Sequence, residues 1–352
     1  MHRACVNQAL PPTERLLRQR VWRTMYIQDR FNSAALGRPM SIHDEDWDDS
    51  NPTTPQSVDR LGIEMVRISC IIGDICRQVY RPRTISSDVA STLARRLHEW
   101  SNNLPADMTV DSLLRNEGTP ARHRHILQRM HLAHLNAVIL LTRPFLFYHV
   151  VTAATKAAAV TATSSKGNGG RTVHRLARAC TLAASRSVAI VQLVSAAYAS
   201  PLRPPFLIYF MFSAGLILLL DAYQDKTSLD HPGISHAMSI LSSYADNDPS
   251  ARRYHHIFQD MHSAVKEKHR GEEIRGINEL GELLYGNGAT SANLAGTPPK
   301  EYDMLQFLAG EPMGFDEEFG TENFNFEFDN AFGYTMLQGD GEFRGMLLNP
   351  DF

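Results

Sequence analysis

Apolar side chains recur at intervals of three and four residues along most of this chain, and no stretch alternates convincingly between apolar and polar residues. The first spacing is that of an amphipathic α-helix, whereas strict alternation marks a half-buried β-strand. The chain is therefore predicted to be all-α, with a multi-helix domain. The expected helices cover about residues 12–36, 57–80, 86–103, 121–142, 171–199, 203–224, 232–246 and 249–269.

The first long helix is expected from Pro12 to Leu36, and it ends at Gly37 with Pro39 two residues later, as helix C-termini commonly do. Its apolar residues fall on two sides, with Val21, Trp22, Met25 and Tyr26 on one and Ile27, Phe31, Ala34 and Ala35 on the other. A helix that is apolar on several sides is normally enclosed by other helices. We therefore expect this helix to be buried on more than one face.

Three later segments carry specific expectations. The fourth helix should end before Pro144, because the residue that precedes a proline is disfavoured in the helical region. The low-complexity stretch 152–170 ends in glycines and is interpreted as a mobile loop. The most apolar run, residues 206–220, is shorter than the roughly 20 residues of a membrane span. It closes at Asp221, so a buried core helix is expected there.

Charge separates the chain into a body and a tail. Residues 301–352 hold 12 acidic residues and one basic residue, Arg344, whereas residues 1–300 hold 34 basic and 26 acidic residues. Such asymmetry is typical of an interaction tail. We interpret residues 1–284 as a helical domain, residues 285–300 as a linker rich in Gly, Ala, Thr and Pro, and residues 301–352 as a disordered acidic tail.

The ligand-forming residues predict no metal site. The four cysteines contain no CxxC pair, so neither a zinc ribbon nor a thioredoxin-like redox motif is indicated. His131 and His134 lie three residues apart on one helix face, but no cysteine or carboxylate lies nearby to complete a set of ligands. The start of the chain lacks the apolar core of a secretory signal. We expect a soluble intracellular protein with no cofactor in this chain and no membrane partner.

A dense run of non-equivalent residues lies between Arg18 and Asp48. It comprises Arg18, Arg20, Trp22, Tyr26, Asp29, Arg30, Ser33, Gly37, Arg38, Pro39, Ile42, Asp44, Asp46 and Asp48. This pattern resembles the signature of the fungal-specific transcription factor domain, or middle homology region, of fungal binuclear zinc-cluster transcription factors. The resemblance extends over roughly residues 12–265 and includes Trp100 before Leu104-Pro105. Arg23 and Trp47 depart from the family pattern.

The resemblance implies a nuclear transcription regulator that is not an enzyme and that forms homo- or heterodimers with related factors. In that family, six upstream cysteines hold two zinc ions and contact DNA. This chain lacks that cluster, so we expect an N-terminally truncated domain with no zinc and no direct contact with nucleic acid. Two interpretations stay open within gene control. The chain is either the regulatory portion of an activator or a DNA-binding-deficient partner that titrates coactivators or relatives.

Asp29 and Arg30 fall inside the expected buried helix, where an unpaired charge is costly. Arg38 and the carboxylates that follow Ile42 are the candidate partners. We expect a structural charge network, with an effector site as the alternative.

The acidic turn 44–49 also permits a different class of function, because clustered carboxylates bind Mg²⁺. An all-α metal-dependent enzyme would need a second metal motif on another helix. We find none in the sequence, so no catalytic residue is predicted.

The tail holds nine of the sixteen phenylalanines of the chain. The most closely spaced are Phe315, Phe319, Phe324, Phe326 and Phe328. Acidic residues interleaved with aromatic residues are the composition of an activation domain, in which repulsion keeps the rings exposed until a partner binds them. We expect the tail to bind transcription coactivators; a merely solubilising tail is the alternative.

Overall fold

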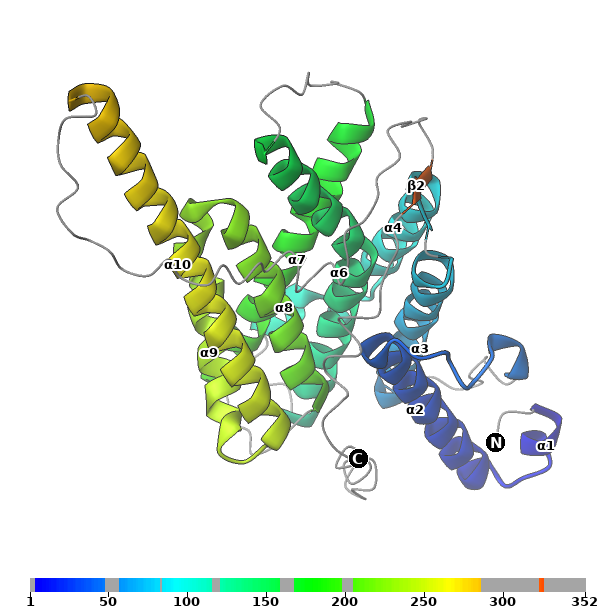
Figure 1. Ribbon diagram of the computed structural model, residues 1–352. Coiled ribbons are helices and arrows are strands. Elements are labelled where there is room, and N and C mark those ends of the chain that lie inside the picture. The colour runs from blue at the N-terminus through cyan, green and yellow to red at the C-terminus, as the bar shows by residue number, and fades with distance from the viewer. Residues whose placement is uncertain are drawn as a thin grey trace. The chain divides into compact units, whose positions relative to one another are not determined.

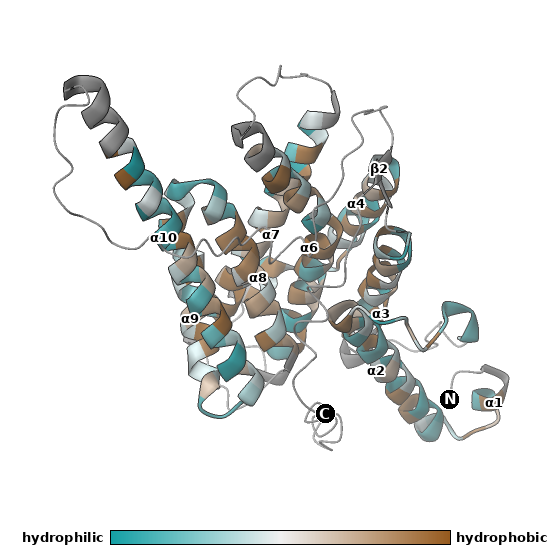
Figure 2. Ribbon diagram, in the orientation of Figure 1, coloured by the Kyte–Doolittle hydropathy of each residue, from teal (hydrophilic) through white to brown (hydrophobic). Residues whose placement is uncertain are grey.

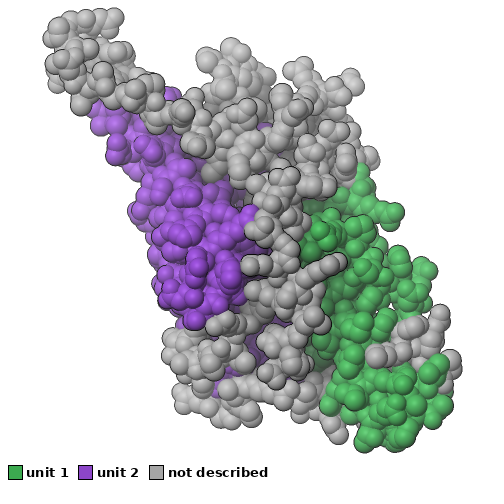
Figure 3. All heavy atoms as spheres, turned by 60° about the horizontal axis from the view of Figure 1, so that its bottom comes forward, with its two compact units in different colours: residues 1–96, 303–352 green, residues 97–302 purple. Residues whose placement is uncertain are grey.

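The computed structural model describes residues 4–47, 57–82, 84–115, 121–158, 168–197, 205–285 and 323–325. These residues are almost entirely helical, which confirms the all-α prediction (Figure 1). They belong to two compact units, residues 1–96 with 303–352, and residues 97–302 (Figure 3). The boundary between the two units falls after Arg96, and residues 1–284 as one domain stay a prediction.

The first unit is built around a pair of helices. Its elements are α1 (Ala4–Gln8), α2 (Pro12–Leu36), the 3-10 turn η1 (Asp44–Asp46), α3 (Ser57–Ile75), the π-helical turn η2 (Cys76–Tyr80), β1 (Thr84–Ser86) and the start of α4 (Ser87–Asn102). Gly37 ends α2 in the left-handed conformation, at φ 63°, and its N–H donates to the carbonyl of Ser33. Glycine adopts this conformation without the steric penalty of a side chain. The helix therefore ends where the sequence predicts.

Only one long face of α2 is buried. Tyr26 and Phe31 lie in the core against α3, whereas Leu17, Val21 and Met25 are 61%, 38% and 47% exposed. These three exposed residues follow one another at intervals of four, on one side of the helix. The expectation that α2 is enclosed on several faces is wrong, because α3 and the short α1 are the helices that pack on it within this unit.

A three-residue ladder joins β1 to β2 (Asn323–Asn325), with Ile85 opposite Phe324 in antiparallel register. Segments this short carry no recognisable alternation, so the sequence did not indicate them. The remainder of the predicted tail lies outside the described residues, including Phe315, Phe319, Phe326 and Phe328. The linker 286–300 also lies outside them.

The second unit is a helical assembly around α8. Its elements are the end of α4, η3 (Ala106–Met108), α5 (Val110–Arg115), α6 (Ala121–Ala158), α7 (Asn168–Ala197), α8 (Pro205–Gln224), η4 (Lys226–Asp230), α9 (Pro232–Ala245) and α10 (Pro249–Tyr285). Helices α6, α7, α9 and α10 all pack on α8, which is apolar over most of its surface (Figure 2). Gly215 allows the closest approach, because a Cβ there would lie 2.6 Å from the ring of Phe258 on α10.

Helix α6 continues through Pro144, so the predicted end before this residue is wrong. Proline removes one backbone donor, but a helix tolerates this loss when packing holds both sides. Phe145, Leu146 and Val150 are all buried beyond the proline, and α6 packs along α7. The predicted loop 152–170 is correspondingly shorter, since residues 152–158 and 168–170 are helical and 159–167 lie outside the described residues.

Two helices are long and apolar enough to cross a membrane by length and composition, residues 123–153 and 206–224. The second of these helices extends to residue 224, whereas the apolar run in the sequence ends at residue 220. Within the protein, 56% and 78% of their most apolar windows are buried, as in core helices of globular domains.

Candidate functional site

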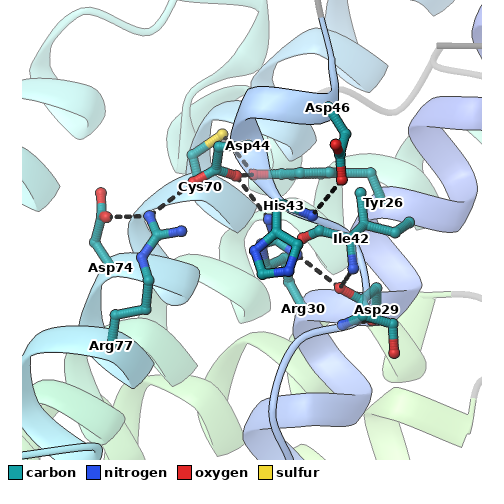
Figure 4. Close-up of polar contacts among 11 residues, drawn as sticks. Tyr26, Asp29, Arg30, Ile42, His43, Asp44, Asp46, Cys70, Asp74 and Arg77 are labelled. Carbon is teal, nitrogen blue, oxygen red and sulfur yellow. Dashed lines mark hydrogen bonds and ion pairs between the residues drawn. The ribbon is translucent and has the colours of Figure 1, made fainter.

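The motif residues of α2 meet the chain that returns after Gly37. Asp29 holds this return, because its carboxylate accepts the N–H of Ser41 at 2.9 Å and that of Ile42 at 3.2 Å (Figure 4). The hydroxyl of Ser33 donates to the carbonyl of Pro39 at 3.4 Å. These bonds place the next turn, η1, beside the middle of α2.

Arg30 is the centre of the site and is 1% exposed. Its guanidinium donates to Asp29 at 2.7 Å, to the carbonyl of Ile42 at 2.8 Å and to Asp44 at 2.6 Å. The same group lies over the ring of Tyr26, with 4.1 Å between Cζ and the ring centroid. A buried cation therefore has two carboxylates, a carbonyl and an aromatic face around it, which offsets much of its desolvation.

Gly73 of α3 leaves the space that Arg30 occupies. A Cβ at this position would lie 2.8 Å from Nε of Arg30 and 3.3 Å from the sulfur of Met40. The glycine is needed for close approach rather than for its backbone conformation, because it lies inside a regular helix.

Tyr26 and Asp44 share a short hydrogen bond in which the phenol donates to the carboxylate. The Tyr26 hydroxyl also lies 3.1 Å from the thiol of Cys70. Burial, together with the bond to Asp44, raises the pKa of Tyr26. Burial opposes the charge on Asp44, but hydrogen bonds from Tyr26, Arg77 and Arg30 outweigh it and lower the pKa of Asp44 to about 2. Asp44 is thus an anion at neutral pH.

The network extends beyond the motif through Asp44. Its second oxygen lies 2.7 Å from Arg77, which η2 carries, and Arg77 lies 2.6 Å from Asp74. Asp74 in turn lies 2.6 Å from Arg96 near the end of the unit. Carboxylates and guanidiniums therefore alternate from Asp29 to Arg96 and connect α2, η1, α3, η2 and α4.

The motif residues outside this network have other positions. Trp22 is half-buried; Arg20, Arg38 and Pro39 are exposed; and Asp48 lies outside the described residues. Asp46 accepts the N–H of His43 at 3.3 Å. The network therefore uses Asp44 where the sequence offered Arg38 and several carboxylates as alternatives.

Sequence reasoning missed Cys70, Gly73, Asp74, Arg77 and Arg96. Asp74 and Arg77 are spaced for a pair on one helix, which is the one local signal for them. Their contacts with Asp44 and Arg96 depend on the packing of separate helices.

Two guanidiniums and a phenol already bind the carboxylate of Asp44, so both of its oxygens have partners. A divalent cation there would have to compete with these donors. Among the described residues, no group of three or more His, Cys, Asp or Glu side chains has the arrangement of a metal site. His131 instead contacts the carbonyl of Met108 at 3.0 Å, and His134 stacks on Trp100 with 5.0 Å between centroids.

Comparison with known proteins gives several fungal relatives. The alignment with Filamentous growth regulator 27 of Candida albicans is 383 positions long and shows 24% identity. It covers 97% of this chain and 46% of that protein. The chain is 26% identical over 263 residues to an uncharacterized transcriptional regulatory protein of Schizosaccharomyces pombe, covering 72% of this chain and 31% of that protein. Transcription factor FBD3 of Gibberella moniliformis is 25% identical over 280 residues, which cover 68% of this chain and 36% of that factor.

Two of these fungal relatives are named as a transcriptional regulatory protein and a transcription factor. The chain spans less than half the length of each of these relatives. No family model matches it, and no solved structure matches it.

Proposed function

We propose that this chain is the regulatory and activation portion of a fungal transcription regulator that acts in the nucleus. The observation that carries the proposal is the match along 97% of the chain to a fungal growth regulator. A match of that extent includes the helical body and most of the acidic tail, so both parts belong to the comparison.

The Arg30 network supports a structural role for the motif within a fungal-specific transcription factor domain. Tyr26, Asp29, Arg30 and Asp44 all contact one another or the same short loop. The four residues are needed together, because each one supplies a hydrogen-bond or ion-pair partner for another or for the loop. We propose that the network holds η1 against α2 and α3, and that it does not bind an effector.

We propose that this chain does not itself recognise DNA. The chain has four cysteines and no CxxC pair, so it carries no binuclear zinc cluster of its own. Residues 1–300 carry a modest excess of basic residues, 34 against 26 acidic ones, whereas sequence-specific binding needs a groove-reading element. We expect no sequence-specific shift of DNA by the isolated chain at moderate salt. We propose coactivators as partners of the tail, and related factors as partners in dimers.

A tethering experiment tests the proposal. The full chain is fused to an unrelated DNA-binding domain that does not itself activate, and a reporter is measured in yeast at matched protein levels. We expect expression well above that of the DNA-binding domain alone. Reporter activity equal to or below this baseline would instead favour the second candidate, a DNA-binding-deficient partner that titrates related factors.

A metal-dependent enzyme built on the acidic turn is the remaining alternative. The position of Asp44 between Arg30 and Arg77 argues against it. Measurement of tightly bound divalent metal in the purified chain separates this alternative from both regulatory ones.

A further inference from the structure

Arg129 on α6 is a largely buried cation, and none of the carboxylates that the structure describes pairs with it. Its Nε atom is fully enclosed and has no hydrogen-bond partner. Burial lowers the pKa of Arg129 to about 10, and no carboxylate among the described residues raises it. Arg30 in the first unit shows the contrast, because the same side chain is there surrounded by Asp29, Asp44 and a carbonyl.

The guanidinium of Arg129 lies near an aromatic side chain from the first turn of α8. Its Cζ is 5.0 Å from the ring centroid of Phe206, in the first turn of that helix. The N-terminus of a helix carries unpaired N–H groups and a partial positive charge. No acidic residue lies in the first turn of α8 to balance it. Within the part of the chain that the structure describes, this guanidinium and the first turn of α8 therefore have no anion between them.

The surrounding sequence supplies no anion either. Residues 118–220 contain 11 Lys and Arg residues and not one Asp or Glu. This stretch includes all of α6 and α7 and most of α8, which pack on one another. The first carboxylate after it, Asp221, lies about 22 Å further along α8 than Phe206, at 1.5 Å per residue. Residues 118–220 therefore supply no counter-ion for Arg129.

We propose that Arg129 and the first turn of α8 bind the carboxylate of a small organic anion, with the ring of Phe206 against the apolar part of that ligand. A guanidinium binds a carboxylate through two parallel hydrogen bonds. Arg129 and Phe206 both keep some solvent-accessible surface, so a ligand can reach them. Leu132 and Ala133, one turn along α6, are buried and apolar. An apolar monocarboxylate suits this setting better than a highly charged anion, which would leave excess charge buried. The site does not depend on the proposed role in transcription.

The test uses the purified full chain and three probes, benzoate, its uncharged analogue benzamide, and inorganic phosphate. Thermal unfolding and calorimetric titration report binding directly. We expect benzoate to raise the Tm of the wild-type protein in a saturable way, phosphate to act more weakly, and benzamide to have no effect.

Variants separate ligand binding from a structural role. Arg129→Met keeps an apolar stem of similar length and removes the charge, so without ligand its Tm should exceed that of the wild type, because the unpaired charge is gone. Its affinity for benzoate should fall at least about thirtyfold, since a buried charge pair has lost one member. Arg129→Lys keeps the charge but loses the planar fork, and its affinity should lie between the two. Arg175→Met removes an exposed cation of α7 from the same acid-free region and should match the wild type.

Several outcomes would overturn the inference. A lower Tm of Arg129→Met without ligand means that the guanidinium already has a structural partner. No stabilisation of the wild-type protein by benzoate, or equal stabilisation of Arg129→Met, excludes the site. An equal loss of affinity in Arg175→Met assigns the effect to diffuse positive charge. Binding of phosphate as tight as that of benzoate excludes the apolar subsite at Phe206.

Discussion

The guanidinium of Arg30 lies 2.6 Å from the carboxylate of Asp44, fourteen residues further along the chain, and this ion pair connects α2 to the turn that follows it. Arg30 is almost fully buried, whereas Asp44 is 37% exposed and also binds Arg77. One carboxylate thus neutralises two arginines from different helices. Loss of its charge leaves the buried Arg30 with Asp29 as its one remaining carboxylate.

Asp44→Asn should therefore destabilise the protein, although the side chain keeps its shape. Removing one partner of a fully buried ion pair costs about 3–5 kcal/mol. We expect about 2 kcal/mol here, since Asp44 is partly exposed and solvent screens the pair. Chemical denaturation measures the change. Asp46→Asn, an exposed neighbour in the same turn, is the matched control and should have little effect. Equal stability of the two variants would contradict the central role of Asp44.

Gly73→Ala and Gly62→Ala should change stability in opposite directions, although both positions lie on α3. At Gly73 a Cβ would lie 2.8 Å from Arg30, and the overpacking should cost about 1–3 kcal/mol. At Gly62 a Cβ has nothing within 4 Å, so the higher helix propensity of alanine should stabilise by roughly 0.5–1 kcal/mol. Thermal melts of the two variants beside the wild type measure the difference. A stabilising Gly73→Ala would show that Arg30 moves aside at little cost.

The buried His131 and the half-buried His134 should make the second unit sensitive to mild acid. Burial lowers the pKa of His131 and of His134 to about 4. The unfolded chain takes up these protons at about pH 6.5, while the folded protein takes them up only near pH 4. The unfolded state therefore binds more protons between these values, and stability is full above about pH 6.5 and falls toward pH 4.

Urea denaturation at pH 7.5, 6.0 and 5.0 measures this loss. The double variant His131→Gln, His134→Gln should show a flatter dependence over that range than the wild-type protein. His256→Gln, at an exposed position on α10, should keep the wild-type slope. A double variant as acid-sensitive as the wild type would assign the effect to other groups.

The exposed side of α2 should promote self-association. Leu17, Val21 and Met25 form an apolar stripe, and contiguous exposed apolar surface favours binding between molecules. Light scattering of the purified chain should show a mass that rises with concentration. The pair Leu17→Lys, Met25→Lys should reduce this rise without lowering the Tm, because both side chains lie outside the core. A monodisperse monomer at all concentrations would contradict the prediction.

Residues 301–352 should activate transcription when fused to an unrelated DNA-binding domain. Changing Phe324, Phe326 and Phe328 to Ala removes apolar groups and leaves the charge intact. Each ring that a coactivator fully buries contributes about 1.5–3 kcal/mol, so reporter activity should fall sharply. Replacement of an equal number of acidic residues by amides should reduce activity less per substitution. An inert wild-type tail, or a triple variant with full activity at equal protein level, would leave the tail as a solubiliser.

Local signals account for the fold class and for the ends of several helices. Pro12 and Gly37 bound α2 as predicted, because a proline in the first turn and a left-handed glycine act within one turn of the chain. The end expected at Pro144 did not occur, since burial of Phe145 and Leu146 outweighed a single missing hydrogen bond. The loss of one backbone hydrogen bond at a proline does not end a helix where neighbouring helices pack against the residues on both sides of it.

The candidate site divides in the same way. The sequence by itself determined that Asp29 and Arg30 are consecutive residues of a helix. It also determined that a group of carboxylates, beginning at Asp44, follows the end of that helix. Only the tertiary structure decided that Asp44 rather than Arg38 joins them, that Gly73 opens the space, and that Arg77 and Asp74 extend the chain of charges. It likewise decided that Arg30 has counter-charges, whereas no described carboxylate pairs with Arg129. Sequence spacing specifies neighbours along one helix. An ion pair in the interior needs a nitrogen–oxygen distance of about 3 Å between side chains of different helices, and packing alone sets that distance.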